Sequence, residues 1–498
     1  MNRERAALLV VLAVTLLLRI GHLAGPTLRD EGVHGYMAQE ILRGHLPFET
    51  VFDNKGVLLY GEQAAALAVF GMHSIAGIRL LGIAFVLGSM VALYLLLRDQ
   101  YGHAEGVMAV ALFGFYSSLM QMQGHYYGSE VFTLLPTNLA ALCAWRGLVK
   151  EDRRLFFLSG LFMGLGIWTR LTVAPFVGSF GLFLLLYYHR SRLAGPWWMG
   201  VGLAVSCVPF IGLYLVAGRM DLLAQSYFLF SGAQLVTADV PGTPLEQLGR
   251  ILAVALPNML ILMVFLAGLP FSPWWRDRRT TFLALWLGGG LLCFLLTGQY
   301  LSKQLHQALP PLCGWAAVVL VDWIGQANWR RTVAWLLLAV SALGAAGLNF
   351  PRYYRLTVDD PSASEPIMVV GERVADWVRE HSQPGDGLFV WGVEWQVYFR
   401  AERRSPSRHI NLLAVILIAI AAQRGAPVGD VLAQVQNEMS TQLKAHPPRY
   451  ILVTSSVKNY GIEAYYLPAE FDAMLQRDYH LLFKDDPYWV FERNNSSR

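Results

Sequence analysis

Apolar and polar residues are segregated into long blocks over roughly the first 350 positions of the chain. The apolar blocks are about 16 to 22 residues long, and a helix of about 20 apolar residues crosses the hydrocarbon core of a bilayer. The pattern therefore predicts about eleven membrane-spanning helices, at residues 6–24, 76–97, 104–122, 130–148, 155–170, 173–188, 197–217, 250–270, 280–297, 304–322 and 332–349.

A shorter apolar block at residues 58–70 precedes the second of these spans. Its length of about 13 residues is short for a span and suits a helix that lies at the membrane surface. We therefore expect it not to cross the bilayer. If it crossed, the orientation of every later segment would be inverted.

The loops between the predicted spans differ in charge. One alternate set holds most of the cations, at Arg3, Arg5, Arg98, Arg146, Lys150, Arg153, Arg154, Arg190, Arg192, Arg276, Arg278, Arg279, Arg330 and Arg331. Short loops rich in Arg and Lys stay on the cytoplasmic side. The pattern predicts a multi-pass protein of the cytoplasmic (inner) membrane with its N-terminus inside. The first loop (25–75) and the C-terminal region are then outside.

The composition agrees with a chain that is surrounded by lipid. Of the 498 residues, 55% are hydrophobic and 15% charged, and the mean hydropathy is +0.41, which excludes an ordinary soluble protein. The first apolar block could be a signal peptide, but no small-residue cleavage site closes it and Arg19 interrupts its end, so we expect a retained span. The net charge of +4 reflects the inside loops, and no nucleic-acid partner is expected. The four cysteines fall inside predicted spans, which predicts neither a disulfide nor a zinc site.

From about residue 350 the sequence changes to polar turns that separate amphipathic and alternating segments. Helical spacing at 366–381 and 431–445 alternates with strand patterns at 387–391 and 450–454, and a hairpin of 479–483 with 489–491 closes the chain. We predict a helical membrane domain over 1–349 and an outside α/β domain over 350–498. The apolar run 412–422 is either a core helix or a helix docked on the membrane.

The first outside loop is the richest in groups that can do chemistry. Asp30 and Glu31 open a helical stretch, and Asp53 and Lys55 follow in its second half. A carboxylate near a helix N-terminus is favoured by the exposed N–H groups. Such a carboxylate suits a general base, which must be ionised when a hydroxyl group arrives. The alternative is that Asp30 only caps the helix, and that Lys55 only pairs with Asp53 on a wet surface.

These residues, in this order, resemble the polyprenyl-phosphate-dependent glycosyltransferases of the GT-C superfamily, such as protein O-mannosyltransferases and lipid A aminoarabinose transferases. The resemblance rests on Asp30-Glu31, on Asp53-Asn54-Lys55-Gly56, and on the segments 300–311 and 375–404. It implies a GT-C-like fold and an inverting transfer of a sugar from a polyprenyl phosphate to a hydroxyl group of a glycolipid, polysaccharide or protein. Asp30 matches the base, Glu31 would support acceptor or metal binding, and Lys55 matches a phosphate-binding lysine.

Further residues are candidates at the same site. Relatives often place a cation near the lipid phosphate where this chain has Arg170, and Lys303 and His306 share a helix face near the membrane surface. Snorkelling of Arg170 and a simple hydrogen-bonding role for His306 are the alternatives. Supporting or acceptor roles are expected for Asp53, His34, Tyr60, His125, Tyr127 and Glu130. Relatives frequently have proline after the loop lysine, whereas Gly56 and Val57 follow Lys55 here.

Two questions stay open on sequence grounds. Metal use varies in the family, so Asp30, Glu31 and Asp53 either bind a divalent cation such as Mg²⁺ or Mn²⁺ or act without one. The competing function is a transporter or flippase of a lipid-linked saccharide, or a scaffold that only resembles the enzymes. Transporters concentrate polar residues near the midplane and often have two related halves, whereas here the polar residues cluster in outside loops.

Overall fold

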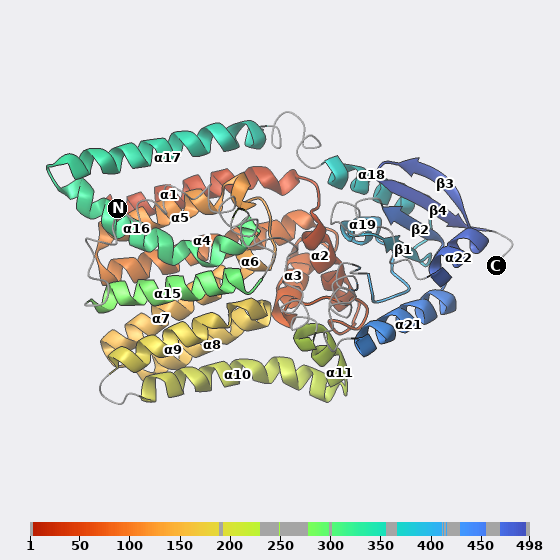
Figure 1. The fold of residues 1–498 in the computed structure, drawn as a ribbon, viewed down its shortest axis with the longest axis horizontal. Coiled ribbons are helices and arrows are strands. Elements are labelled where there is room, and N and C mark those ends of the chain that lie inside the picture. Colours follow the sequence, from red (N-terminus) through yellow and green to blue (C-terminus); the bar gives the residue numbers. More distant parts are fainter. Residues whose placement is uncertain are drawn as a thin grey trace. The chain divides into compact units, whose positions relative to one another are not determined.

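The computed structural model describes residues 3–188, 193–229, 277–297, 301–354, 366–410, 429–454 and 469–494, and the single residues 249, 412 and 415. The chain forms two compact units (Figure 1). Unit 1 consists of Met1–Leu23, Arg79–Leu213 and Val240–Thr357. Unit 2 consists of Ala24–Ile78, Tyr214–Asp239 and Val358–Arg498.

Unit 1 is helical. Its helices are α1 (Arg3–Ile20), most of α4 (Ile75–Gln100), α5 (His103–Ser117), α6 (Ser129–Phe132), α7 (Leu134–Lys150), α8 (Arg153–Thr169), α9 (Pro175–Tyr187), α10 (Ala194–Val216), α15 (Arg278–Leu295), α16 (Leu309–Gly325) and α17 (Trp329–Tyr354). Helix α7 packs on α8, α5 on α16, and α15 on both α9 and α16, and these helices run side by side in Figure 1. All the predicted spans but one are thus confirmed as helices. The exception, 250–270, lies outside the described residues.

Several of these helices suit a membrane. Within the described residues, four apolar stretches are long enough to cross one: Arg5–Ala24, Ile75–Gln100, Ser129–Lys150 and Ala194–Val216. Leu17 on α1 and Val208 on α10 are about two-thirds exposed, although both are strongly apolar. Helices that expose apolar side chains in this way need lipid around them. The chain is therefore a multi-pass membrane protein, and its predicted orientation stays a prediction.

Helices α8 and α10 approach each other unusually closely. A Cβ atom at Gly160 would lie 1.8 Å from the carbonyl oxygen of Met199, and one at Gly202 would lie 2.0 Å from that of Phe157. One turn further along, Gly164 faces Ser206. Small residues spaced four apart allow helix backbones to touch in this way inside a membrane.

Unit 2 contains a four-stranded sheet. Its strands are β1 (Leu388–Trp391), β2 (Tyr450–Thr454), β3 (Tyr479–Asp485) and β4 (Tyr488–Arg493), in the order β1-β2-β4-β3. Strands β1 and β2 are parallel, with Leu388 opposite Tyr450, and the other pairs are antiparallel. The helices around it are α18 (Pro366–Glu380), α19 (Gln396–Ala401), α21 (Gly429–Ala445) and α22 (Ala469–Asp478). This confirms the predicted α/β elements and adds α19 and α22.

Side chains alternate between the two faces of this sheet, as the strand period of two requires. Phe389 and Ile451 enter a core with residues of α21 and α22. On the opposite face of the sheet, the rings of Tyr450 and Phe483 pack against Trp377 of α18. Their ring centres lie 5.6 and 4.7 Å from that of Trp377. Of the run 412–422, only Leu412 and Val415 are described, and both join the core. The choice between a core helix and a docked helix stays open.

The first loop belongs to unit 2. It forms α2 (Arg29–Leu42) and α3 (Val57–Phe70), which pack on each other, and α19 packs against both α2 and α18. Residues 24–78 and 358–498 therefore share one unit, although about 280 residues of sequence separate them. The predicted helix at 58–70 is confirmed as α3, and its position at the membrane surface stays a prediction. So does the domain boundary near residue 349.

Candidate active site

Asp30 lies in the first turn of α2, as the sequence predicts, and is half-buried. The neighbouring Glu31 is buried, and its Oε2 accepts a hydrogen bond of 3.2 Å from the backbone N–H of Leu28. Glu31 thus closes the helix N-terminus from inside the first turn. Asp30 lies where the positive end of the helix dipole favours a carboxylate. Its proposed role as a base is compatible with this position.

Two glycines set the position of α2. A Cβ atom at Gly32 would lie 2.1 Å from Cα of Gln396, and one at Gly35 would lie 2.9 Å from the ring of Phe399. Both partners belong to α19. Because glycine has no side chain, the backbones of α2 and α19 meet directly two residues after Asp30. Any bulk at Gly32 would push the turn that carries Asp30 away from α19.

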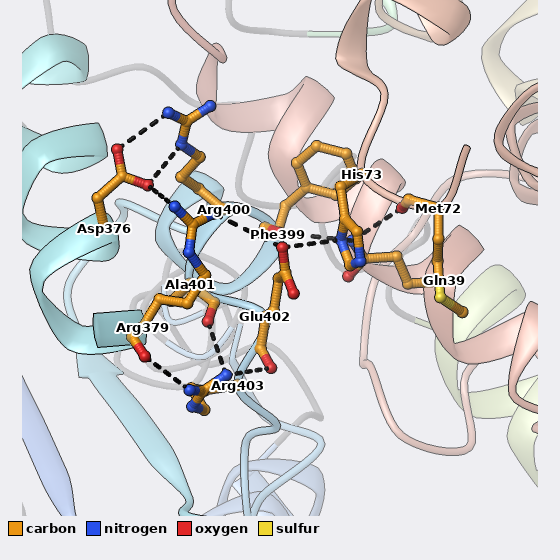
Figure 2. A network of polar contacts seen from close by, with 10 residues as sticks. All are labelled: Gln39, Met72, His73, Asp376, Arg379, Phe399, Arg400, Ala401, Glu402 and Arg403. Atoms are coloured by element: carbon orange, nitrogen blue, oxygen red, sulfur yellow. Dashed lines mark hydrogen bonds and ion pairs between the residues drawn. The ribbon is translucent and has the colours of Figure 1, made fainter. Parts of the chain in front are cut away.

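Polar contacts hold the other end of α19 (Figure 2). Arg400 makes two hydrogen bonds of 2.9 Å to the carboxylate of Asp376 on α18. On the other side, Gln39 of α2 donates to the carbonyl oxygen of Phe399 at 3.4 Å. Next to it, His73 lies 3.5 Å from the carboxylate of Glu402. Helix α19 is thus held between α18 and the first loop at both of its ends.

Asp53, His34 and Tyr60 come together in unit 2. All three are buried, and the hydroxyl group of Tyr60 donates to Oδ2 of Asp53 at 2.8 Å. Nε2 of His34 lies 3.6 Å from the same oxygen. The Tyr60 hydroxyl also accepts a hydrogen bond of 3.2 Å from the backbone N–H of Lys55. Tyr60 therefore links the acidic and the basic residue of this motif.

Lys55 is half-buried, and its ammonium group donates to the side-chain oxygen of Asn54. Since the amide is neutral, this contact leaves the charge of Lys55 intact for an anionic group. Among the residues that the structure describes, no three His, Cys, Asp or Glu side chains gather as ligands of one ion. Metal binding by Asp30, Glu31 and Asp53 stays the open alternative that the sequence left.

Arg170 and Glu130 form an ion pair in unit 1. Arg170 directly follows α8, and its guanidinium also donates to Ser129 at 3.3 Å and to Thr172 at 2.7 Å. A predicted phosphate-binding residue is thus paired with a predicted acceptor residue. The carboxylate of Glu130 offsets much of the charge that Arg170 would present to a phosphate.

Lys303 and His306 lie on a 3₁₀ helix (Ser302–Gln307) that leads into α16, rather than on α16 itself. Residues three apart eclipse each other in a 3₁₀ helix, so the two still share a side. The ammonium group of Lys303 lies 4.0 Å from the ring centre of Tyr126, and the next residue after His306, Gln307, donates to the carbonyl oxygen of Glu130 at 3.0 Å. This segment therefore packs on residues 126–130, between α5 and α7, near the Arg170–Glu130 pair.

His125 and Tyr127 lie close to the end of α1. The rings of His125 and His22 are 5.8 Å apart, and the guanidinium of Arg19 lies 5.9 Å from the ring centre of Tyr127. Both residues therefore pack within unit 1. Their expected acceptor role stays a prediction.

Sequence reasoning missed two buried arginines in unit 1. Arg19 donates to the carbonyl oxygens of Ser117 and Gly124, at 2.5 and 2.9 Å. Arg79 donates to the carbonyl oxygens of His22 and Leu23, at 2.9 and 3.2 Å. Both were visible as cations inside apolar blocks, a position that in membranes usually marks a specific partner. They hold the loops that carry His22 and His125.

The candidate residues divide between the two units. Unit 2 carries Asp30, Glu31, His34, Asp53, Lys55 and Tyr60, and unit 1 carries His125, Tyr127, Glu130, Arg170, Lys303 and His306. Within unit 2 the structure brings His34, Asp53 and Tyr60 together. Within unit 1 it brings Glu130, Arg170 and the Lys303–His306 segment together. The catalytic and phosphate-binding roles of all these residues stay predictions.

The chain is similar over nearly its whole length to two solved glycosyltransferase structures. ArnT from Cupriavidus metallidurans, bound to undecaprenyl phosphate, is 17% identical with a TM-score of 0.63, over 99% of this chain and 98% of that one. AglB from Archaeoglobus fulgidus is 11% identical with a TM-score of 0.51, over 100% of this chain and 75% of that one. The chain therefore shares the fold of these two proteins, which confirms the fold that the resemblance implied.

A family model matches part of the chain. Residues 62–214 match the model of the dolichyl-phosphate-mannose-protein mannosyltransferase family. None of the curated proteins matches the sequence. The AglB structure is that of an archaeal oligosaccharyltransferase in complex with an inhibitory peptide and a dolichol-phosphate. The ArnT and AglB structures thus both contain a polyprenyl phosphate.

Proposed function

We propose that this protein is an inverting glycosyltransferase that moves a sugar from a polyprenyl phosphate to an acceptor hydroxyl group at the outer face of the inner membrane. The observation that carries the proposal is the position of Asp30, in the first turn of a helix whose backbone is fixed against α19. Supporting it, the fold matches 98% of an ArnT chain that binds undecaprenyl phosphate. The acceptor is a glycolipid, a glycan or a protein.

Asp30 acts as the base in this proposal. Its carboxylate accepts the proton of the acceptor hydroxyl group as that oxygen attacks the anomeric carbon. The bond from the anomeric carbon to the phosphate oxygen breaks, both electrons leave with the polyprenyl phosphate, and the configuration at the carbon inverts. The proton then passes from Asp30 to water.

The leaving phosphate needs positive charge rather than a proton, because it is a good leaving group at neutral pH. In this proposal Lys55 supplies a compact ammonium group. Lys303 and His306 are the further candidate donors. Arg170, which is paired with Glu130, contributes less net charge and mainly holds Ser129 and Glu130.

The test compares Asp30→Asn with Asp221→Asn in cells that lack the native gene. Asp221 is a suitable control because it also lies in the first turn of a helix and is half-exposed. Mass spectrometry of glycolipids, polysaccharides and glycoproteins identifies the product that depends on the gene. We expect Asp221→Asn to restore this product and Asp30→Asn to abolish it, with unchanged membrane levels and unchanged binding of undecaprenyl phosphate.

Product formation at the wild-type rate by Asp30→Asn would refute the assignment of the base. A transporter gives a different result. In that case the gene deletion would leave a lipid-linked saccharide on the inner leaflet, and Asp30→Asn would restore its appearance on the outer leaflet.

A further inference from the structure

The segment just before Asp30 is held by two glutamates from the C-terminal part of the chain. One is Glu372 of α18, whose Oε1 accepts hydrogen bonds from both the backbone N–H and the hydroxyl group of Thr27, each 2.9 Å long. A single carboxylate oxygen thus fixes both the main chain and the side chain of Thr27. This residue lies three positions before Asp30.

The second glutamate is Glu394, which is completely buried. Its Oε1 accepts from the guanidinium of Arg29 at 3.1 Å, and its Oε2 accepts from the backbone N–H of Val393 at 3.0 Å and from the hydroxyl group of Thr454. The Arg29 guanidinium and the Val393 N–H can only donate, and they face different oxygens, so only a group that accepts with both of its oxygens satisfies them. A buried carboxylate with these partners gives a fixed direction to Arg29, the residue directly before Asp30.

Room for this arrangement comes from Gly392. A Cβ atom there would lie 2.1 Å from Oγ1 of Thr454 and 2.7 Å from Oε2 of Glu394. Any other residue at this position would displace the hydrogen bond between the two. The segment 392–394, which follows β1 directly, is therefore built around the Glu394 carboxylate.

A similar contact holds the second motif of the first loop. The backbone N–H of Phe52 donates to the carbonyl oxygen of Arg408 at 2.7 Å, and the rings of Phe52 and His409 lie 5.2 Å apart. Arg408 and His409 are themselves fixed by Glu438 of α21, at 2.9 and 3.0 Å. Phe52 directly precedes Asp53, so this contact fixes the segment that continues to Lys55.

We propose that the C-terminal part of the chain positions the reacting groups of the first loop, with Glu394 as the principal positioning residue. Glu394 and Glu372 direct the turn that carries Asp30, and Arg408 directs the segment that carries Asp53 and Lys55. The catalytic consequence rests on the proposed function, whereas the structural consequence does not. This gives the C-terminal α/β region a role at the reacting groups themselves, apart from any choice of acceptor.

The first test is Glu394→Gln in the full-length protein, with Asp485→Asn as the matched control. Like Glu394, Asp485 pairs with an arginine. Its partner is Arg373 of α18, at 2.7 Å, and this pair is exposed. In Glu394→Gln the amide nitrogen must face one of the two obligate donors, so the hydrogen bond from Arg29 or from the Val393 N–H is lost. Hydrogen–deuterium exchange, read by mass spectrometry, should be at least about 10-fold faster in residues 24–42 of Glu394→Gln than in the control.

The second readout is the rate of formation of the gene-dependent product. A displacement of about 1 Å can lower a rate by about 100-fold. We expect Glu394→Gln to lose at least about 10-fold in turnover and to bind undecaprenyl phosphate with the wild-type Kd, because the phosphate-binding cations are untouched. When Glu394→Gln is combined with Asp30→Asn, turnover should not fall below that of Asp30→Asn alone. A merely structural role would lower turnover, binding and protein yield together.

A double variant that can restore the hydrogen bond between positions 29 and 394 provides a further test. In Arg29→Gln with Glu394→Gln, the amide of position 394 can donate to the amide oxygen of position 29 while its own oxygen accepts from Val393. We expect the double variant to exchange more slowly over residues 24–42 than Glu394→Gln does, and to regain part of its turnover.

Wild-type exchange over residues 24–42 in Glu394→Gln would overturn the proposal, as would turnover equal to that of Asp485→Asn when Asp30→Asn is inactive. If Asp30→Asn itself is active, the base assignment fails. The exchange measurement then still decides whether Glu394 holds the segment.

Discussion

Gly32→Ala is the most direct perturbation of the turn that carries Asp30. The new Cβ atom would lie 2.1 Å from Cα of Gln396 and 2.8 Å from its backbone nitrogen. Carbon atoms pack at about 3.5–4.0 Å, so α2 and α19 would have to separate by about 1.5 Å. The close contact is with backbone, which cannot rotate away as a side chain would.

Two opposing effects set the change in stability. Overpacking costs about 1–3 kcal/mol, and alanine in place of glycine in a helix returns at most about 1 kcal/mol. The net loss should therefore be at most about 3 kcal/mol, and we expect the protein still to fold. Turnover should fall by on the order of 100-fold for a displacement of about 1 Å.

The assay measures product formation and thermal unfolding in the same membrane preparation, with Gly61→Ala as the control. Gly61 lies in α3 of the same unit, and a Cβ atom there would meet nothing within 4 Å. Gly61→Ala should keep wild-type turnover and gain up to about 1 kcal/mol of stability. Equal turnover of the two variants would show that the spacing of α2 and α19 does not control the reaction.

Three further predictions concern other parts of the chain. Gly160→Leu should separate α8 from α10 and lower the melting temperature, whereas Gly200→Leu, where no atom lies within 4 Å, should not; equal melting temperatures would contradict this. Tyr60→Phe removes the hydrogen bonds to Asp53 and from Lys55, and should cost about 1–3 kcal/mol and weaken the binding of undecaprenyl phosphate, measured by calorimetry. Although burial alone would raise the pKa of Glu438, its contacts with His409 and Arg408 lower it to about 2. The stability that Glu438 contributes should thus be complete above its ordinary pKa of about 4.3 and be lost as the pH falls toward 2. The melting temperatures of the wild type and Glu438→Gln should converge over that range, and a constant difference would count against this cause.

Hydrophobic periodicity predicts the local elements well, because helices and strands have distinct periods. The spans of unit 1, the helix α21 and the strands β1 and β2 each carry their own signal within 4 to 26 neighbouring residues. The same reasoning placed Asp30 in the first turn of a helix, and α2 begins at Arg29. Short-range patterns are sufficient for features of this kind.

The tertiary contacts of the site could not be predicted in this way. Thr27 meets Glu372, and Arg29 meets Glu394, across more than 340 residues of sequence. The spacing of residues around either partner does not predict which distant residue it will contact. The role of Gly32 is similarly hidden, because a glycine near a helix N-terminus has many explanations until Gln396 is seen against it.

The ion pair of Arg170 with Glu130 could not be predicted either, because it also joins residues that are distant in sequence. Arg170 and Glu130 belong to separate loops, and each was considered alone as a group that could meet substrate. The structure pairs them, so much of their charge is already balanced. Lys303 and His306 keep the shared side that their spacing predicts, but on a 3₁₀ helix, since the segment before Pro310 does not join α16.

Unit 2 is built from parts of the chain that are synthesised at different times. The turn that carries Asp30 is made well before the residues that hold it. Asp30 leaves the ribosome early, but the residues that hold its turn lie at 372, 394 and 396. At about 5–20 residues per second, the intervening stretch of about 370 residues takes roughly 20 to 70 s to make. During that time the turn that carries Asp30 lacks the residues that hold it. Under the proposed function, a chain that stops short of residue 394 is expected to insert its helices and remain inactive, so activity is expected only after the C-terminal part has been made.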